Sequence, residues 1–172
     1  QTLTRNSAFI ANAARQVQAE EFCFPDGVVD VARLYQQFAD GGTIVFNQLH
    51  TVLPVLHDLC RSLERDLSCR FQTNIYMTPG RSQGFPTHYD SHDVFILQVH
   101  GVKHWQVFNT PIELPFRGQP FKRDETPKGD VTMEFDLEPG DMFYLPRGMM
   151  HDAQTREGET LHITLGALAT SW

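Results

Sequence analysis

Two histidines and one aspartate have the residue types and the spacing of a metal site. His88 and Asp90 stand two residues apart, directly before the apolar run 94–99, and His151 follows far downstream after the segment EPGDMFYLPRGMM. Residues i and i+2 of a strand point to the same side, so His88 and Asp90 can converge on one ion. His151 must then come from another strand that folding brings alongside. Two neutral imidazoles and one carboxylate leave open positions opposite them, which suits Fe(II) and oxygen chemistry.

The pattern His-x-Asp alone is weak evidence, because it is common by chance and a lone histidine is more often a surface or core residue than a ligand. The context favours a metal site: a strand-like run follows Asp90, and a turn and the strand-like segment 142–146 precede His151. His50 and His57 fall on a predicted helix, where histidines are usually solvated or capping. We therefore predict that His88, Asp90 and His151 bind the metal.

The composition is that of an ordinary globular protein with an acidic balance. The 172 residues are 41% apolar and 20% charged, enough for one domain with a real core. Fourteen basic against 21 acidic residues give a net charge of −7, which does not support a direct nucleic-acid partner. No apolar run reaches the roughly 18 residues of a membrane span.

Three cysteines, Cys23, Cys60 and Cys69, are odd in number and lack CxxC spacing. They predict free thiols in a reducing compartment rather than disulfides or zinc ligands. We therefore expect a cytoplasmic protein, or a nuclear or nucleolar one if the source is eukaryotic.

The first third of the chain predicts helices. Residues 7–21 are rich in Ala and Gln, and residues 28–39 repeat apolar side chains at helical spacing. A short β-branched strand is expected at 43–46. Leucines recur at helical spacing over 49–67, with Pro54 tolerable in the first turn.

Two later segments alternate polar and apolar residues and predict the walls of a cavity. In the strand expected at 70–77, Asn74 and Tyr76 lie on a polar row. In the strand expected at 160–168, His162 and Thr164 share a second polar row. A polar row can also face water, but the first strand leads into the His88 loop, which favours a cavity.

Residues 94–99 are apolar on both faces and predict a central strand. We expect a hairpin turn at His100-Gly101, with 102–108 pairing back. On this return strand Lys103 lies between core-like neighbours, where a charge is costly unless an anion meets it; the alternative is a surface lysine. Residues 109–130 have no periodicity and predict a loop over the barrel mouth or a disordered excursion.

These elements predict an α+β fold dominated by an antiparallel double sheet, the double-stranded β-helix of cupins and jelly rolls. We expect residues 1–172 to form a single domain, in which a helical part, 1–70, packs on a barrel core, 71–172. The chain lacks an initial Met and ends directly after a predicted strand, so we expect it to be part of a longer protein.

The segments PTHYDSHDVFILQVHGVKHW and LEPGDMFYLPRGMMHDA resemble the JmjC-type cupin oxygenases, in particular the ribosomal oxygenase branch. The resemblance is strong over 71–172 and weak before. It implies Fe(II) as cofactor and 2-oxoglutarate as cosubstrate. That family places a basic residue at the spacing of Lys103, 15 residues after His88. The resemblance thus implies that Lys103 binds the distal carboxylate of 2-oxoglutarate, with Asn74, Tyr76 and Thr164 as helpers.

The resemblance also implies the reaction and the partners. Members of the branch couple oxidative decarboxylation of 2-oxoglutarate to hydroxylation of a histidine or arginine side chain in a ribosomal protein. The acidic balance of this chain suits a basic partner of that kind. A homodimer is implied through regions outside this chain. A small-molecule 2-oxoglutarate oxygenase, a JmjC histone demethylase and a non-catalytic ligand-binding cupin remain alternatives.

Overall fold

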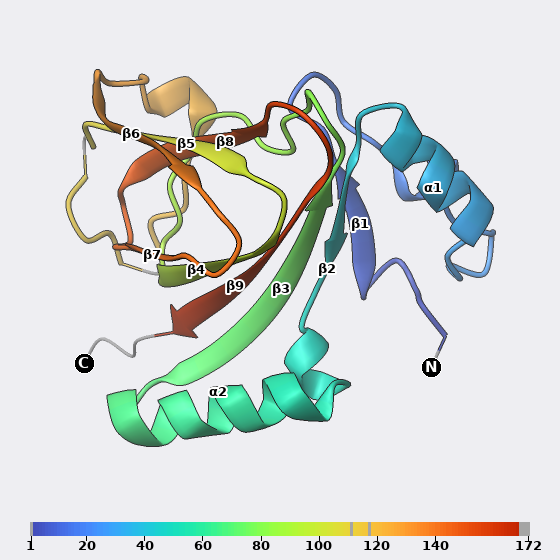
Figure 1. Ribbon diagram of the computed structural model, residues 1–172, viewed down its shortest axis with the longest axis horizontal. Helices are drawn as coiled ribbons and strands as arrows, with labels where there is room; N and C mark the ends of the chain where they lie inside the picture. The colour runs from blue at the N-terminus through green and yellow to red at the C-terminus, as the bar shows by residue number, and fades with distance from the viewer. Residues whose placement is uncertain (1, 111, 117, 169–172) are drawn as a thin grey trace.

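The alternation of apolar and polar residues produces two antiparallel β-sheets that pack face to face (Figure 1). The structure is a computed structural model and describes residues 2–110, 112–116 and 118–168. The larger sheet has the order β1-β2-β3-β9-β4-β7, and the smaller has the order β6-β5-β8. The strands are β1 Ala8–Ala11, β2 Thr43–Phe46, β3 Arg70–Thr78, β4 Asp93–His100, β5 Lys103–Phe108, β6 Val131–Leu137, β7 Met142–Leu145, β8 Met150–Thr155 and β9 Thr160–Leu168.

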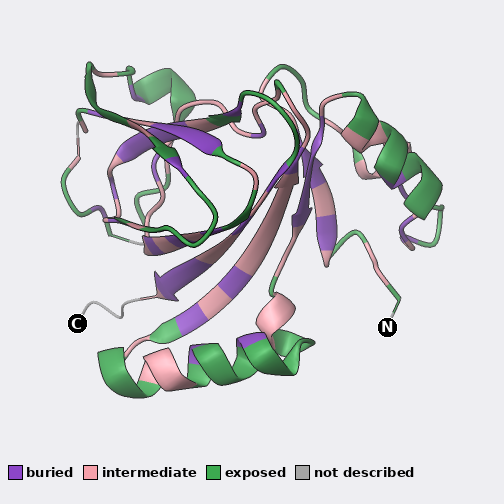
Figure 2. Ribbon diagram, in the orientation of Figure 1, coloured by how far each residue is buried: buried purple, intermediate pink, exposed green. Residues whose placement is uncertain are grey.

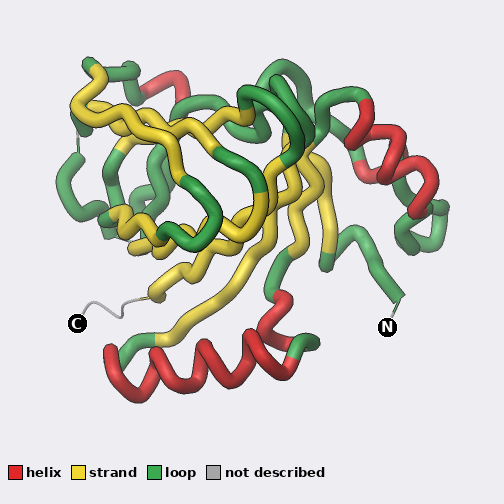
Figure 3. The backbone as a smooth tube through the Cα atoms, in the orientation of Figure 1, coloured by secondary structure: helices red, strands yellow, loops and turns green. Residues whose placement is uncertain are grey.

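The helices lie outside the two sheets, as the red segments of Figure 3 show. They are α1 Val31–Ala39 and α2 Pro54–Leu67, with short 3-10 turns η1 Ala19–Glu21, η2 Leu49–Thr51 and η3 Arg123–Glu125. In the described residues, no helix is long and apolar enough to cross a membrane.

Local capping sets where the two helices begin. Asp30 caps α1 by accepting hydrogen bonds from the backbone N–H groups of Ala32 and Arg33 at 3.0 and 3.2 Å. Pro54 occupies the first turn of α2, where its missing N–H is not needed. The helices predicted over 28–39 and 49–67 are therefore present with later starts, and the strand predicted at 43–46 is confirmed as β2.

The helix predicted over residues 7–21 is wrong. Ala8–Ala11 form β1, which pairs with β2 in the register Ala8↔Phe46 to Ala11↔Thr43 and buries most of its side chains. The following residues are irregular, and Asn12 accepts a hydrogen bond from the N–H of Ala14. Helix propensities are a weak prior, and burial against a neighbouring strand outweighs them here.

The hairpin predicted at His100-Gly101 is also wrong. β4 pairs with β9 and β7, whereas β5 crosses to the smaller sheet and pairs with β6 and β8. Gly101 makes the crossing with a positive φ of +65°, and the side-chain amide of Gln98 donates to the carbonyls of His100 and Gly101. A short turn between two apolar runs predicts a hairpin, but the true partners of β4 come much later in the chain.

The core between the sheets is a single cluster with members from both. Val94 and Ile96 of β4 meet Trp105 and Val107 of β5 across the sandwich, together with Leu137 of β6. Figure 2 shows the purple, buried positions on the facing strands, with green positions on the outer helices and loops. On the other side of the larger sheet, α2 covers β3 and β9.

The described residues of 109–130 form an irregular loop that contains only η3. Part of it packs against the segment that carries His88: the Tyr89 hydroxyl donates to the carbonyl of Gln119 at 3.3 Å, and Phe121 contacts the Tyr89 ring edge-on at 5.3 Å between centroids. This part of the loop thus packs against the barrel beside the predicted ligands.

Candidate metal and cosubstrate site

Backbone pairing brings the two predicted histidine ligands together. The segment 81–90 runs along the free edge of β8, and His88 and His151 exchange backbone hydrogen bonds of 3.0 and 2.8 Å. His151 belongs to β8, whereas His88 forms an isolated bridge outside the named strands. Because opposite residues of a paired edge project to the same face, the two imidazoles lie together, with ring centroids 4.5 Å apart.

Backbone carbonyls orient both rings in the same way. Nδ1 of His88 lies 2.9 Å from the carbonyl of Pro86, and Nδ1 of His151 lies 2.9 Å from the carbonyl of Met149. A carbonyl only accepts, so each Nδ1 carries a proton, and Nε2 is the ring nitrogen that faces the other ligands and can bind a metal. This is the tautomer that a metal-ligating histidine needs.

Asp90 completes the group of three predicted ligands. One ligand atom each of His88, Asp90 and His151 lies within 4.8 Å of the others, and His151 Nε2 is 4.0 Å from Asp90 Oδ2. Burial, and then the nearby His88, lowers the pKa of His151, so its imidazole is neutral at physiological pH. Two imidazoles and a carboxylate on one side therefore fit a divalent ion such as Fe(II).

These side chains open into a cavity of about 300 Å³ between the sheets. Its volume is at the lower end for ligand pockets, which suits a small molecule. The residues that line it come from both sheets and from the segment before β4: Phe9, Thr43, Asn47, Asn74, Tyr76, Gly84, Phe85, His88, Asp90, Val94, Ile96, Lys103, Trp105, Leu145, His151, Ala153, His162 and Thr164.

The two predicted polar rows form one wall of this cavity, as expected. Asn74 on β3 lies opposite Thr164 on β9, and Tyr76 lies opposite His162. The rings of Tyr76 and His162 stack in parallel at 4.7 Å. Burial, and to a lesser degree Asp90, raises the pKa of Tyr76, so its hydroxyl stays protonated and can donate a hydrogen bond.

Lys103 is buried on the opposite sheet with only 4% of its surface exposed. Its ammonium donates to the Thr78 hydroxyl at 2.9 Å and lies 3.4 Å from His162 Nδ1. In the described residues, no carboxylate lies within 4.0 Å of it. Burial lowers the pKa of Lys103 to about 7, which is the physical mark of a buried cation that lacks an anion.

The structure thus brings together all seven predicted site residues on one cavity. His162, which the sequence placed on the polar row without a binding role, and Trp105, which was not predicted to line a cavity, are among its other lining residues. Alternation could have assigned Trp105 to the cavity, because it lies two residues after Lys103 on the same face of β5.

Comparison with known proteins places this fold and cavity in a family. Residues 48–172 match the JmjC domain. The chain belongs to the JmjC domain family. The predicted double-stranded β-helix is confirmed, because the JmjC domain is a cupin-type double sheet and the observed strands form one.

Curated relatives of this JmjC domain carry hydroxylase and oxygenase names. A "bifunctional lysine-specific demethylase and histidyl-hydroxylase NO66" of Drosophila persimilis is 38% identical over 144 residues, which are 83% of this chain and 21% of that protein. "Ribosomal oxygenase 2" of Bos taurus is 36% identical over 151 residues, 86% of this chain and 32% of that protein. The chain therefore spans only about a fifth to a third of these relatives' length.

Solved structures show the same fold. YcfD, a ribosomal oxygenase from Escherichia coli in complex with cobalt and 2-oxoglutarate, superimposes with a TM-score of 0.66 at 19% identity. That comparison covers 96% of this chain and 40% of the YcfD chain.

Proposed function

We propose that this JmjC domain is an Fe(II)- and 2-oxoglutarate-dependent oxygenase that hydroxylates a histidine or arginine side chain of a ribosomal protein. One observation carries the proposal. One small cavity has three convergent candidate metal ligands, His88, Asp90 and His151, and the buried Lys103, which has no carboxylate partner among the residues that the structure describes. A dicarboxylate that chelates the metal at one end would also pair with the Lys103 ammonium at its other end.

Each side chain has a separate task in this proposal. His88, Asp90 and His151 hold the ion through two Nε2 atoms and a carboxylate, with the imidazoles fixed by their Nδ1 bonds to backbone carbonyls. Lys103 holds the far carboxylate of 2-oxoglutarate by charge-assisted hydrogen bonds. Iron and 2-oxoglutarate, when bound, supply the oxidation, in which decarboxylation to succinate accompanies hydroxylation of a C–H bond.

The remaining residues of the cavity wall bind the cosubstrate and shield it from water. Asn74, Tyr76 and Thr164 offer polar contacts to the cosubstrate along one wall. Val94, Ile96 and the other apolar lining residues keep bulk water from the cavity and strengthen the electrostatic contacts inside it.

The names of the relatives support the substrate class. Ribosomal oxygenases and a histidyl-hydroxylase are among the curated relatives, and a ribosomal oxygenase with cobalt and 2-oxoglutarate is among the fold neighbours. The net charge of −7 suits a basic ribosomal partner. The acidic residues Glu113, Asp124, Glu125 and Asp130 of the loop are exposed and available for such a contact.

The test combines cosubstrate turnover with mass spectrometry. The protein is incubated with Fe(II), 2-oxoglutarate and a ribosomal protein fraction. Succinate should be released, and one ribosomal protein should gain the mass of one oxygen atom on a histidine or arginine. The His88→Ala protein, in the same mixture, should release no succinate. If ribosomal proteins stay unmodified while a metabolite is oxidised, a small-molecule oxygenase replaces the protein hydroxylase.

A histone demethylase is the second candidate, favoured by the demethylase activity named for the Drosophila relative. The same metal and cosubstrate site would serve it, because oxidation of an N-methyl group releases formaldehyde. Methylated histone peptides, offered in place of ribosomal proteins, should then lose one methyl group per formaldehyde formed. Demethylation without any hydroxylated ribosomal protein would make this the function.

A further inference from the structure

The position of His88 depends on how the segment 81–90 is held against β8. Its backbone bonds to the region around β8 are made at Arg81 and Ser82 at one end and at His88 and Asp90 at the other. The residues between lack such a bond, and His88 belongs to no named strand. A ligand on so lightly paired a segment needs further support, because a metal site must hold its ligands within about 0.5 Å.

Side chains on the far side of the same pair supply that support. His88 and His151 point into the cavity, so their neighbours Thr87 and Asp152 lie on the opposite face of the paired segments, as alternation along strands requires. There the Thr87 hydroxyl donates to Asp152 Oδ2 at 2.6 Å. The bond joins the residue before one histidine to the residue after the other, and so ties the two ligand segments directly behind the predicted ion.

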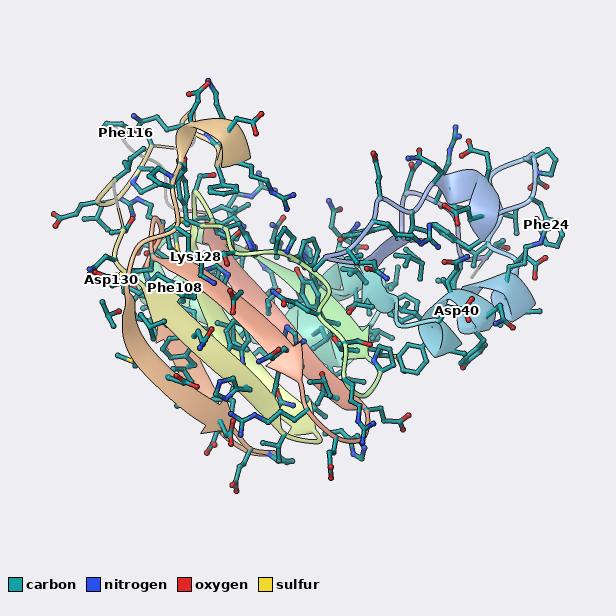
Figure 4. The ribbon with its side chains drawn as sticks, turned by 90° about the horizontal axis from the view of Figure 1, so that it is seen from above. Phe24, Asp40, Phe108, Phe116, Lys128 and Asp130 are labelled. Carbon is teal, nitrogen blue, oxygen red and sulfur yellow. The ribbon has the colours of Figure 1, made fainter. Side chains whose placement is uncertain are left out.

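A third segment also contacts Asp152. Lys128, from the loop 109–130, donates to the same Asp152 oxygen at 3.2 Å, and its ammonium lies 4.1 Å from the centre of the Phe108 ring. Figure 4 shows Lys128 beside Phe108 at the end of β5. Phe108 is 1% exposed, so the ring that receives the lysine is itself fixed in the barrel.

Of the two hydrogen bonds that the Asp152 carboxylate accepts, the one from Thr87 is the stronger, because it is the more buried. The Asp152 side chain is 11% exposed, whereas the Lys128 side chain is 52% exposed. A largely buried carboxylate needs its hydrogen bonds, and a bond from a neutral hydroxyl to a charged acceptor is among the stronger types. The contact with the half-exposed lysine is screened by water and contributes less.

We propose that Thr87, Asp152 and Lys128 form a latch that positions His88 against His151, so that these three are positioning residues for the metal centre. The inference rests on the proposed metal function. Loss of the latch lets the segment 81–90 move away from β8, which separates the ligand atoms and weakens metal binding while the fold persists. Partners outside the ligands typically affect metal affinity by about 10–100-fold.

The test measures Co(II) binding to the whole chain by calorimetry and by the visible spectrum of the bound ion, which reports ligand geometry independently of activity. Thr87→Val keeps the shape and removes the donor, so we expect about 10-fold weaker Co(II) binding and an altered spectrum. Thr87→Ser keeps the hydroxyl and should restore both. The matched control is Thr51→Val, which removes a hydroxyl that bonds to the Gln48 carbonyl at 2.8 Å in η2, outside both ligand segments and outside the cavity lining.

Three results would overturn the latch. If Thr87→Val has the affinity and spectrum of the wild-type protein, the latch is overturned, while the proposed function still stands. An equal loss in Thr51→Val also overturns it, because the effect would then be one of general stability. Absence of Co(II) and Mn(II) binding by the wild-type protein overturns the proposed function, and the latch with it. If circular dichroism shows that Thr87→Val does not fold, Asp152→Leu takes its place because it removes both acceptor oxygens. Unchanged Co(II) affinity in that variant overturns the proposal.

Discussion

At the scale of single residues, burial gives the site its chemistry. His151 is 6% exposed and Lys103 is 4% exposed, so both lose the hydration that normally favours their charged forms. The consequence for His151 is a neutral imidazole that can bind a metal. The consequence for Lys103 is a cation whose stability depends on a bound anion.

Removal of one imidazole should abolish metal binding. His88→Ala leaves only Asp90 and His151, and loss of a ligand should exceed the roughly 100-fold effect of outer partners on affinity. Metal content after anaerobic Fe(II) loading measures this. The control is His57→Ala on α2, whose side chain is 58% exposed and lies outside the cavity. Full iron content in the His88→Ala protein would contradict the assignment of His88.

Removal of the Lys103 charge should weaken the binding of the cosubstrate without weakening the binding of the metal. Lys103→Met keeps the apolar stem and loses the ammonium, so metal binding should persist while 2-oxoglutarate affinity falls. A buried charge pair broken from one side costs about 2–5 kcal/mol, roughly 30-fold or more in affinity. Calorimetry with Mn(II) in place of iron measures it, with the exposed Lys122→Met as control. An unchanged affinity would remove Lys103 from the cosubstrate site.

The affinity for 2-oxoglutarate should also depend on pH. The pKa of Lys103 is lowered to about 7 by burial, so the free protein holds the ammonium below pH 7 and loses it above. Affinity should therefore be flat below pH 7 and fall by up to about tenfold per unit above it. Burial, with Lys103 nearby, also lowers the pKa of His162, so that imidazole stays neutral and does not compete in this range.

Calorimetry at saturating Mn(II) tests this in two buffers of different ionisation enthalpy. At pH 8 the binding of 2-oxoglutarate should take up close to one proton, because the bound anion restores the ammonium. Equal affinities at pH 6.5 and pH 8.5, with no proton uptake, would show that Lys103 does not titrate in this range.

At the scale of elements, the crossing from β4 to β5 decides what faces the cavity. Had β5 paired with β4 as a hairpin, Lys103 would lie in the same sheet as the polar wall. The crossing at Gly101 instead places Lys103 on the opposite sheet, where it reaches Thr78 and His162 across the cavity.

A side chain at Gly101 should therefore destabilise the protein. Gly101 has a φ of +65°, and a Cβ there would lie 2.2 Å from the carbonyl oxygen of Glu159. The backbone strain alone costs about 1–3 kcal/mol, and the contact with backbone adds to it. Gly101→Ala should lower the midpoint of thermal unfolding clearly, whereas Gly118→Ala, where nothing lies within 4 Å, should not. Equal midpoints for the two variants would contradict this account of the crossing.

At the scale of the whole molecule, the two sheets share one core and should unfold together. Leu137 of the smaller sheet packs in the same cluster as Val94 and Ile96 of the larger sheet. Leu137→Ala should cost about 2–5 kcal/mol. Val131→Ala, at a position 47% exposed on the same strand, should stay within about 0.5 kcal/mol. Coincident far- and near-ultraviolet circular dichroism transitions would support one cooperative unit, and separate transitions would contradict it.

Local periodicity in the sequence was enough to predict which residues share a face of each strand. The spacing of His88 and Asp90, the polar rows through Tyr76 and Thr164, and the common face of Lys103 and Trp105 all follow from the two-residue repeat of a strand. Because this repeat is a property of the extended backbone, it can be read before any partner strand is known. These residues accordingly line one cavity in the structure.

The pairing of the strands and the contacts that support the ligand segments could be seen only in the tertiary structure. β1 formed where propensity predicted a helix, because the edge of β2 offered burial and hydrogen bonds to residues 8–11. β5 does not pair with β4, because the hydrogen-bonded partners of both strands come from later in the chain. The latch of Thr87, Asp152 and Lys128 joins three segments distant in sequence. Such contacts depend on long-range packing, on which the local pattern of residues carries no information.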